Sequence, residues 1–169
     1  AVTDEGTQEI TGITTISASG QTVELDVATN NFADEVRITG NAVTVVDEDA
    51  LVLGASTVAG TYTVNAGGAV TDSDTLTITG LATLTTSASG ADIELDQTGS
   101  TFAAGISLNT TGSSGNATVD NGTNALIIAA SSLGGNLTLT SGHGDGIIDA
   151  AGAIVTVGGN LSATTNANN

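Results

Sequence analysis

The sequence of this 169-residue chain contains one pattern twice, and the second copy begins near Ile78. Residues 20–26 read GQTVELD and residues 90–96 read GADIELD. In the same way, residues 50–58 (ALVLGASTV) return as residues 125–133 (ALIIAASSL). A chain with a fixed internal period buries its core by stacking copies on one another. We therefore expect a solenoid whose function lies on a long surface rather than in a single active site.

The distance between equivalent residues of the two copies grows along the chain. It is shortest at the start of the copies, from Ile10 to Ile78, and longest at their end, from Leu76 to Val155. The additional residues fall in segments rich in Gly, Ser and Asn, such as 111–115 and 141–146. Insertions that collect in turns, while apolar positions keep their order, are typical of stacked strands joined by variable loops. The sequence predicts one continuous β-solenoid over residues 1–169, with internal repeats at about 10–77 and 78–156 and a partial third copy at 157–169.

A shorter rhythm lies inside each copy. Residues 134–138 (GGNLT) recur at 158–162 (GGNLS), and Gly60 recurs at a similar interval as Gly80. Segments such as 22–26 and 61–64 alternate apolar and polar residues, which indicates strands with one buried face. A rung of about 20–24 residues, about three per copy, predicts an all-β parallel β-helix. About seven rungs at ~4.8 Å each would give a rod on the order of 35 Å long.

The composition agrees with strands and turns. Hydrophobic residues make up 39% of the chain but aromatic residues only 2%, so Val, Ile, Leu and Ala must form the core. The chain has 23 Gly and no Pro, which indicates many tight turns. Thr, Ser, Asn and Asp favour strands and turns over helices, so we expect little helix.

The charge balance excludes several classes of partner. Arg37 is the only basic side chain against 18 carboxylates, and the formal net charge is −17. Binding of nucleic acid requires a basic surface, so this role is close to excluded, and attraction to anionic lipid is disfavoured for the same reason. The absence of Cys excludes disulfides, thiol catalysis and cysteine–zinc sites. No run of about 18 apolar residues occurs, so we expect no membrane insertion. The chain starts at Ala1 without a signal peptide, which favours a processed product or a segment of a longer protein.

Two pairs of carboxylates could in principle carry chemistry. Glu24 and Asp26, repeated as Glu94 and Asp96, lie two positions apart on one face of a strand, so their side chains are about 7 Å apart. Paired carboxylates can hydrolyse glycosides. An enzyme rarely carries its catalytic pair in both copies of a scaffold, so we interpret these residues as a solvated face, with surface cation binding as an alternative.

Three further segments are weaker candidates. The run Asp47–Glu48–Asp49 corresponds to Asp-Asn-Gly at 120–122 and is interpreted as an acidic turn rather than a metal site. Residues 141–149 (SGHGDGIID) resemble a fragment of the calcium-binding nonapeptide repeat, but one imperfect copy favours a loop insertion. His143, the only histidine, stands between glycines that would position a general base poorly. We therefore predict no catalytic, cofactor-binding or metal-ligating residue and no required cofactor, with calcium kept as an alternative.

Five glycosylation sequons occur in the second half of the chain. We expect their asparagines to lie in turns and to stack in hydrogen-bonded ladders, with glycosylation as an alternative. They are Asn109, Asn116, Asn121, Asn136 and Asn160.

Several stretches resemble a known family. The segments ADIELDQTGSTFAAGISL (91–108), NALIIAASSLGGNLTLTSG (124–142) and GAIVTVGGNLSATT (152–165) are similar to the repeats of large bacterial surface proteins of the filamentous haemagglutinin type. The resemblance covers about residues 10–165. It implies a right-handed parallel β-helix, secretion across the outer membrane, and an adhesive or fibre-forming role.

From these observations we expect a structural or adhesive segment of an extracellular bacterial surface protein, acting as a rigid spacer or filament subunit, and no enzymatic activity. The expected partners are the chain itself, end to end or within a longer chain, a host or neighbouring cell surface, and glycans. The alternative is a secreted polysaccharide-acting β-helix enzyme or a carbohydrate-binding module. Lyases that act on acidic polysaccharides need more basic residues than Arg37 alone, and carbohydrate-binding modules usually expose aromatic rings.

Overall fold

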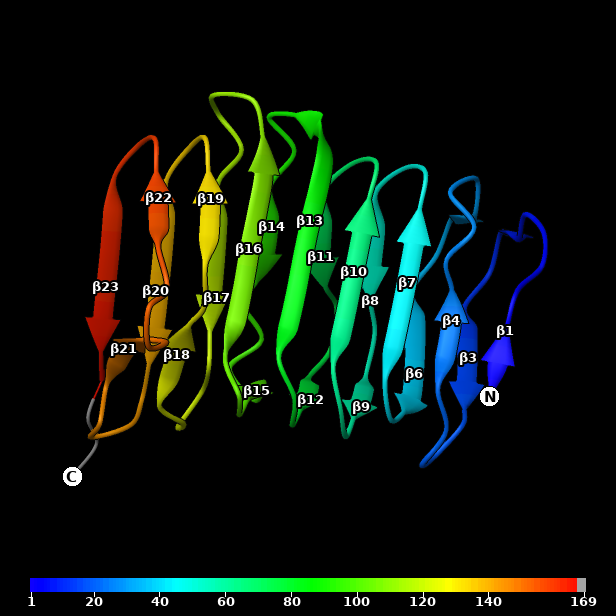
Figure 1. The fold of residues 1–169 in the computed structure, drawn as a ribbon, viewed down its shortest axis with the longest axis horizontal. Helices are drawn as coiled ribbons and strands as arrows, with labels where there is room; N and C mark the ends of the chain where they lie inside the picture. Colours follow the sequence, from blue (N-terminus) through cyan, green and yellow to red (C-terminus); the bar gives the residue numbers. More distant parts are fainter. Residues whose placement is uncertain (167–169) are drawn as a thin grey trace.

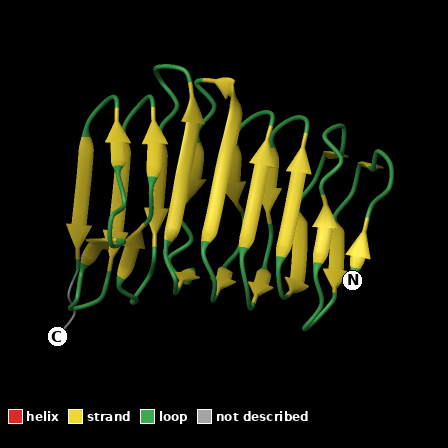
Figure 2. Ribbon diagram, viewed as in Figure 1, coloured by secondary structure: helices red, strands yellow, loops and turns green. Residues whose placement is uncertain are grey.

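The structure is a computed structural model that describes residues 1–166, and in this range the chain consists of strands and turns without a helix. The strands run parallel to their neighbours and stack along one axis into a β-solenoid (Figures 1 and 2). The prediction of an all-β parallel solenoid is therefore confirmed. Residues 167–169 of the predicted third copy lie outside the described range. In the described part of the chain, no helix is long and apolar enough to cross a membrane.

The strands, in chain order, are β1 (Val2–Thr3), β2 (Glu9–Ile10), β3 (Thr14–Ser17), β4 (Val23–Leu25), β5 (Asn31–Phe32), β6 (Val36–Gly40), β7 (Val43–Asp47), β8 (Leu51–Leu53), β9 (Ser56–Val58), β10 (Tyr62–Ala66), β11 (Val70–Asp72), β12 (Leu76–Ile78), β13 (Ala82–Ser89), β14 (Ile93–Leu95), β15 (Thr101–Phe102), β16 (Ile106–Thr111), β17 (Ala117–Asp120), β18 (Leu126–Ile128), β19 (Ser131–Leu133), β20 (Leu137–Ser141), β21 (Ile147–Asp149), β22 (Val155–Val157) and β23 (Leu161–Thr165). They form a ten-stranded sheet, an eleven-stranded sheet and the small pair β2–β5.

The solenoid has about eight turns. One ladder of paired residues crosses the ten-stranded sheet from end to end, with one residue per turn: Val2, Val23, Val43, Tyr62, Ala82, Ile106, Ile128 and Asp149. The shortest step in sequence is the one from Val43 to Tyr62, and the longest is the one from Ala82 to Ile106. The length of a turn thus agrees with the spacing expected from sequence, whereas the number of turns is about eight instead of about seven.

The core lies between the two large sheets and follows the alternation of the sequence. In β10, Tyr62, Val64 and Ala66 are buried, whereas Thr63 and Asn65 between them face outward and are half-buried. The three aromatic side chains of the protein, Phe32, Tyr62 and Phe102, are all at most 2% exposed. Burial of each large apolar side chain stabilises the fold by about 1.5–3 kcal/mol, and the turns are therefore held together along the whole axis.

Most turns combine one long strand on one side of the core with a pair of short strands on the other side. Between β7 and β16, the long strands β7, β10, β13 and β16 belong to the ten-stranded sheet, and short pairs such as β8 and β9 belong to the eleven-stranded sheet. Before β7 and after β16 the arrangement is reversed: β6, β17, β20 and β23 are long strands of the eleven-stranded sheet. The exchange takes place where two long strands follow each other in sequence, at β6–β7 and at β16–β17.

This exchange explains the number of turns. Val36 of the first copy lies in the eleven-stranded sheet, whereas its equivalent Ile106 lies in the ten-stranded sheet; Val23 and Ile93 are exchanged in the opposite sense. Equivalent residues therefore lie on opposite faces of the solenoid, and one copy comprises about three and a half turns. Two copies account for about seven turns, and the partial third copy at the C-terminal end adds the remainder.

Candidate functional site

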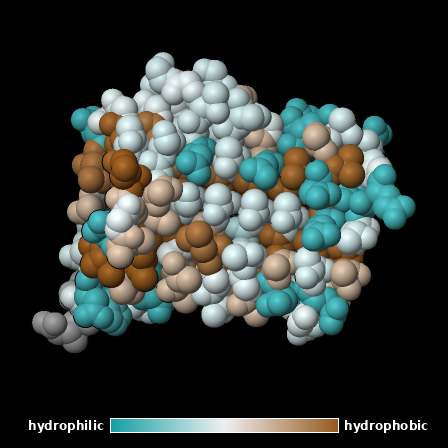
Figure 3. All heavy atoms as spheres, viewed as in Figure 1, coloured by the Kyte–Doolittle hydropathy of each residue, from teal (hydrophilic) through white to brown (hydrophobic). Residues whose placement is uncertain are grey.

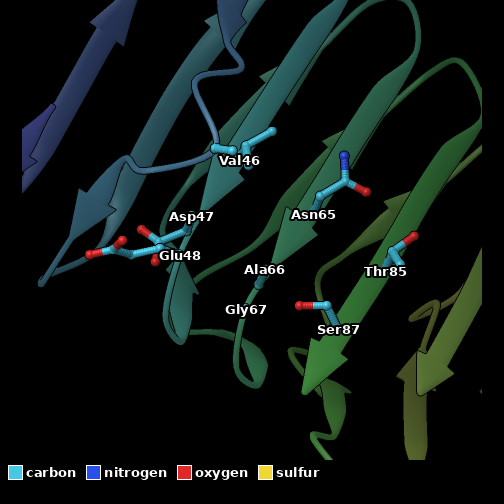
Figure 4. Close-up of a pocket in the computed structure, with 9 residues that line it drawn as sticks. Val46, Asp47, Glu48, Asn65, Ala66, Gly67, Thr85 and Ser87 are labelled. Carbon is cyan, nitrogen blue, oxygen red and sulfur yellow. The ribbon is translucent and has the colours of Figure 1, made fainter. Parts of the chain in front are cut away.

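A hollow lined by both apolar and polar residues crosses several turns on the ten-stranded face of the solenoid (Figure 4). It has a volume of about 370 Å³ and lies near the C-terminal ends of the long strands β7, β10 and β13. Each of the turns that it crosses contributes residues to its wall, so the hollow runs along the solenoid axis. The lining residues are Ala28, Val46, Asp47, Glu48, Asn65, Ala66, Gly67, Thr85 and Ser87.

A second hollow of about 300 Å³ occupies the equivalent position in the second copy. Asn65, Gly67 and Ser87 of the first hollow correspond in the repeat to Thr140, Gly142 and Asn166 of the second. The second hollow is lined by Thr98, Asp120, Gly122, Thr123, Thr140, Gly142 and Asn166. The repeat therefore builds the same surface feature twice.

The two hollows face opposite directions. The first adjoins β7, β10 and β13 of the ten-stranded sheet, and the second adjoins β17, β20 and β23 of the eleven-stranded sheet. The long strands of the two sheets run in opposite directions (Figure 1), so their C-terminal ends lie at opposite edges of the solenoid. Each hollow consequently opens at its own face and its own edge.

Outward-facing side chains stand in a row across each hollow. Asn65 pairs in register with Val46 of the preceding turn and with Thr85 of the following turn. Figure 4 shows Asn65, Thr85 and Ser87 with their polar atoms standing off the ribbon. In the second hollow, Thr140 pairs with Asp120 and Thr164 in the same manner. Each turn thus presents a hydrogen-bonding or small apolar group at a spacing of about 4.8 Å.

Asp47 forms part of the wall of the first hollow and stabilises the turn instead of facing the solvent. It is 2% exposed, its Oδ2 accepts the backbone N–H of Phe32 (2.7 Å) and its Oδ1 accepts that of Asp49 (2.8 Å). Burial is the main cause of the raised pKa of Asp47. The acidic segment 47–49 therefore contains one buried carboxylate, that of Asp47, which satisfies a buried N–H group, whereas Glu48 and Asp49 are exposed.

The second copy performs the same task with an amide. Asn121 is fully buried, and its Oδ1 accepts the backbone N–H of Phe102 (2.7 Å), the equivalent of Phe32. Its Nδ2 also donates to the carbonyl oxygen of Ala125 (2.7 Å). A buried side chain that bonds the N–H of this phenylalanine is thus a property of the repeat, whether the side chain is charged or neutral.

Gly67 and its equivalent Gly142 form the floor of the hollows, where successive turns lie in close contact. A Cβ atom on Gly67 would lie 1.7 Å from the carbonyl oxygen of Glu48, and one on Gly142 would lie 2.5 Å from that of Gly122. Both glycine N–H groups donate to the preceding turn, Gly67 to Asp47 (2.8 Å) and Gly142 to Gly122 (2.6 Å). Only glycine allows this contact without a shift of the backbone.

A second set of side chains forms hydrogen bonds between neighbouring turns outside the hollows. Oδ1 of Asp92 accepts the N–H of Asn116 (2.6 Å), Oδ1 of Asn116 accepts that of Asn136 (2.9 Å), and Oδ1 of Asn136 accepts that of Asn160 (2.8 Å). These bonds form a ladder over four turns. The predicted asparagine ladder is confirmed for the side chains of two of the five sequon asparagines, Asn116 and Asn136; Asn160 joins it through its backbone N–H, and Asn109 and Asn121 bond elsewhere.

An aspartate that the sequence reasoning overlooked joins successive turns a few residues before each copy begins. Asp4 and Asp72 each accept, through Oδ1, the N–H of a residue one turn later, Asp26 and Asp96 respectively, and both distances are 3.1 Å. The signal is the tetrapeptide AVTD, which stands at 1–4 and again at 69–72. Asp72 is 8% exposed, and burial is the main cause of the rise of its pKa to about 6.

The remaining candidates from sequence do not assemble into a reaction centre. Glu24, Asp26, Glu94 and Asp96 are exposed and flank buried leucines, as the alternation predicts. His143 lies in the loop between β20 and β21, where its Nδ1 accepts the N–H of Asp145 (3.0 Å). Among residues 1–166, no group of three or more His, Asp or Glu side chains is placed to hold a metal ion.

Both ends of the solenoid expose core residues. The C-terminal end has an apolar hollow of about 230 Å³ lined by Ile128, Leu137, Leu139, Ile147, Ile148, Asp149, Val155 and Leu161. Leu161 and Ile154 at this end are 60% and 75% exposed, and Figure 3 shows apolar surface gathered there. At the N-terminal end, Ile10, Ile16 and Phe32 contribute to a similar hollow of about 250 Å³.

Comparison with known proteins identifies a repeat family. The model of a family described as repeats of unknown function (DUF5649) matches residues 1–39 and 40–109. No curated protein and no solved structure matches the chain. The second matched segment begins at Gly40, the last residue of β6, and ends at Asn109 in β16. Its limits therefore coincide with the two places where the long strands change sheets.

Proposed function

This chain belongs to the DUF5649 family of repeats of unknown function, and we propose that it is a structural segment, a rigid β-helical spacer or filament subunit of an extracellular bacterial surface protein. The observation that carries the proposal is the unbroken ladder of eight strands from β1 to β21. A structure built of stacked turns has a length set by the number of its repeats, which is the property that a spacer requires.

Stiffness would come from bonds that join each turn to the next. Backbone hydrogen bonds between parallel strands run along the axis, and the side chains of Asp72, Asn116 and Asn136 add further bonds in the same direction. Bending the rod would stretch these bonds on one face and compress the packed core on the other. Resistance to bending is therefore inherent in the repeat.

The apolar residues of the first and last described turns support continued stacking, within a longer chain or with a second copy, as the main partnership. Leu161 and the other core residues at the C-terminal end would be buried by a further turn, supplied by a longer chain or by a second copy. The net charge of −17 opposes lateral association of such rods and keeps a repetitive β protein soluble. Export, adhesion and contacts with host or neighbouring cells rest on the resemblance to haemagglutinin-type repeats and belong to the proposal.

An insertion tests the spacer role. A second copy of residues 40–109 placed after Asn109 adds three and a half turns, and we expect the rod to lengthen by about 17 Å at ~4.8 Å per turn. Small-angle scattering and electron microscopy measure this length. A matched insertion of residues 40–98 ends in the middle of a turn, and we expect it to fold poorly. An insertion of 40–109 that leaves the length unchanged would contradict the proposal.

The rival function is a secreted enzyme or binding module acting on polysaccharides. The only guanidinium, that of Arg37, forms an ion pair with Glu35, which leaves little positive charge for acidic substrates. We expect no turnover when the chain is incubated with neutral and acidic polysaccharides, and release of reducing ends would favour the enzyme. We also expect the same Tm in EDTA and in millimolar Ca²⁺, and a Tm that rises with Ca²⁺ would support calcium binding at 141–149.

A further inference from the structure

The duplicated hollow has the dimensions of a binding groove. Each copy is formed by four successive turns, through Ala28, residues 46–48, residues 65–67 and residues 85–87 in the first copy. Three intervals of about 4.8 Å make this groove about 14 Å long along the axis. A turn spacing of this size is close to the length of one pyranose residue in an extended polysaccharide. A linear sugar chain along the axis would place about one residue on each turn.

The groups in the grooves are those that bond to sugar hydroxyls. Asn65, Thr85 and Ser87 offer an amide and two hydroxyls, which both donate and accept hydrogen bonds. The second groove offers Thr140, Asn166 and the carboxylate of Asp120. A sugar hydroxyl also donates and accepts, so these amide, hydroxyl and carboxylate groups are complementary to it, and the apolar side chains of Ala28 and Val46 beside them in the first groove can contact the sugar C–H groups.

Charge selects among polymers. The groove linings include Asp47 and Glu48 in one copy and Asp120 in the other, and among the described residues that form them there is no basic side chain. With a net charge of −17, the surface repels uronates, sulfated glycans and nucleic acids. Peptide strands need a free sheet edge, whereas β7, β10 and β13 are paired on both sides. A neutral polysaccharide is not repelled by the negative charge and needs no free sheet edge.

We propose that the two hollows are equivalent binding grooves for a neutral, extended polysaccharide, one on each face of the solenoid. Because one copy of the repeat spans three and a half turns, every further copy adds a groove rotated by half a turn. A chain with two grooves on opposite faces links two polysaccharide strands, and repetition multiplies weak contacts into strong attachment. This site adds to the spacer role the polysaccharide binding of the rival function, without its enzymatic turnover, and it does not depend on the spacer role.

The experiment measures binding of three probes, cellohexaose, mannohexaose and xylohexaose, by isothermal titration calorimetry and NMR titration. We expect at least one of them to bind with a stoichiometry of two per chain. Asn65→Ala combined with Ser87→Ala should weaken one site at least tenfold, and Thr140→Ala combined with Asn166→Ala should weaken the other. Each double variant should then titrate with a stoichiometry of one.

Matched controls lie on the same strands. Thr63 and Thr138 face outward two positions before Asn65 and Thr140 and do not line the grooves, so Thr63→Ala and Thr138→Ala should leave binding unchanged. The inference is overturned if no hexasaccharide binds at millimolar concentration, if polygalacturonate binds better than the neutral probes, or if the control variants weaken binding as much as the groove variants. If no hexasaccharide binds but the insertion of residues 40–109 still lengthens the rod, the proposal of binding grooves is rejected and the spacer role stands.

Discussion

Asp72 accepts the backbone N–H of Asp96 from the next turn, with 3.1 Å between Oδ1 and the nitrogen, while its Oδ2 is buried and has no hydrogen-bond partner in the described part of the chain. Its equivalent before the first copy, Asp4, is better satisfied. Oδ2 of Asp4 accepts a bond from Nδ2 of Asn30 (2.6 Å), in addition to the bond from Asp26 to Oδ1. The two copies therefore differ by one buried hydrogen bond.

The unpaired oxygen predicts a pH dependence of stability. The pKa of Asp72 is raised from 3.8 in the unfolded chain to about 6 in the fold, so the folded state binds the proton more tightly. The resulting stabilisation is fully present below about pH 4 and is lost as the pH rises through about 6. It amounts to at most about 3 kcal/mol. Asp72→Asn should therefore raise the free energy of unfolding at pH 8 by about 1–2 kcal/mol and have little effect at pH 4, as measured by urea denaturation.

A second variant separates burial from overall charge. Glu24→Gln also removes one carboxylate, but from an exposed position, and should change stability by less than about 0.5 kcal/mol. An equal gain for Asp72→Asn at both pH values would show that the buried carboxylate is not the cause.

The difference between Asn30 and Ser100 predicts a substitution that supplies the hydrogen bond missing at Oδ2 of Asp72. These residues are equivalent and both are fully buried, but Ser100 only accepts the N–H of Leu76 (3.1 Å). Ser100→Asn supplies an amide to Oδ2 of Asp72, as Asn30 does for Asp4, and should stabilise the fold at pH 8 by about 1 kcal/mol. In a double-mutant cycle the gain should largely disappear when Asp72 is replaced by Ala. A gain that persists there would mean that the amide bonds elsewhere.

The sequence was sufficient to predict the stacking but not the phase of the repeat. Alternation in segments such as Tyr62–Ala66 and the spacing of the glycine pairs identify strands and the length of a turn. They do not identify which sheet a strand joins, because long strands of both sheets share one pattern. The half-turn in each copy appears only when β6 and β7 are seen on opposite sides of the core.

The candidate site was harder to predict for the same reason. The hollow consists of residues from four turns of the solenoid, and in sequence each of them looks like an ordinary strand or loop residue. Asp47 shows the limit most clearly: nothing in a run of three carboxylates indicates that the first one is buried and bonds the backbone N–H of Phe32. The recurrence of a glycine at 67 and 142 was the signal that could have located the floor of the hollow.

Gly67 tests whether this floor requires glycine. Gly67→Ala places a methyl group against the carbonyl of Glu48, and because backbone cannot yield as a side chain can, we expect a loss of about 1–3 kcal/mol or more. Gly144→Ala is the control, since its Cβ would meet no atom within 4 Å. Thermal unfolding measures both variants. Equal Tm values for the two would show that the turns can separate at the floor.

Asp47 and Asn121 predict that the repeat prefers the neutral side chain. In Asp47→Asn the amide oxygen can still accept the N–H of Phe32, as that of Asn121 does for Phe102. The substitution also removes a carboxylate whose pKa is raised by burial. We expect a gain of about 1 kcal/mol at pH 8 and a smaller one at pH 4. Asn121→Asp should do the opposite, because it buries a charge and removes the bond to Ala125. Urea denaturation at both pH values measures the pair, and a loss of stability in Asp47→Asn would mean that the bond to Asp49 matters more than the charge.

Leu137 and Leu161 are neighbours in one ladder, and they predict where the solenoid is open. Leu137 is 1% exposed and Leu161, one turn later at the C-terminal end, is 60% exposed. Leu137→Ala should cost about 2–5 kcal/mol, because it leaves a cavity in a packed core. Leu161→Ala should cost less than about 1 kcal/mol in dilute solution, where no further turn covers it. If rods associate through this end, Leu161→Asp should abolish the association that sedimentation velocity detects at high concentration. The Tm of the dilute protein should stay unchanged. A large loss of Tm would show that Leu161 already belongs to the core.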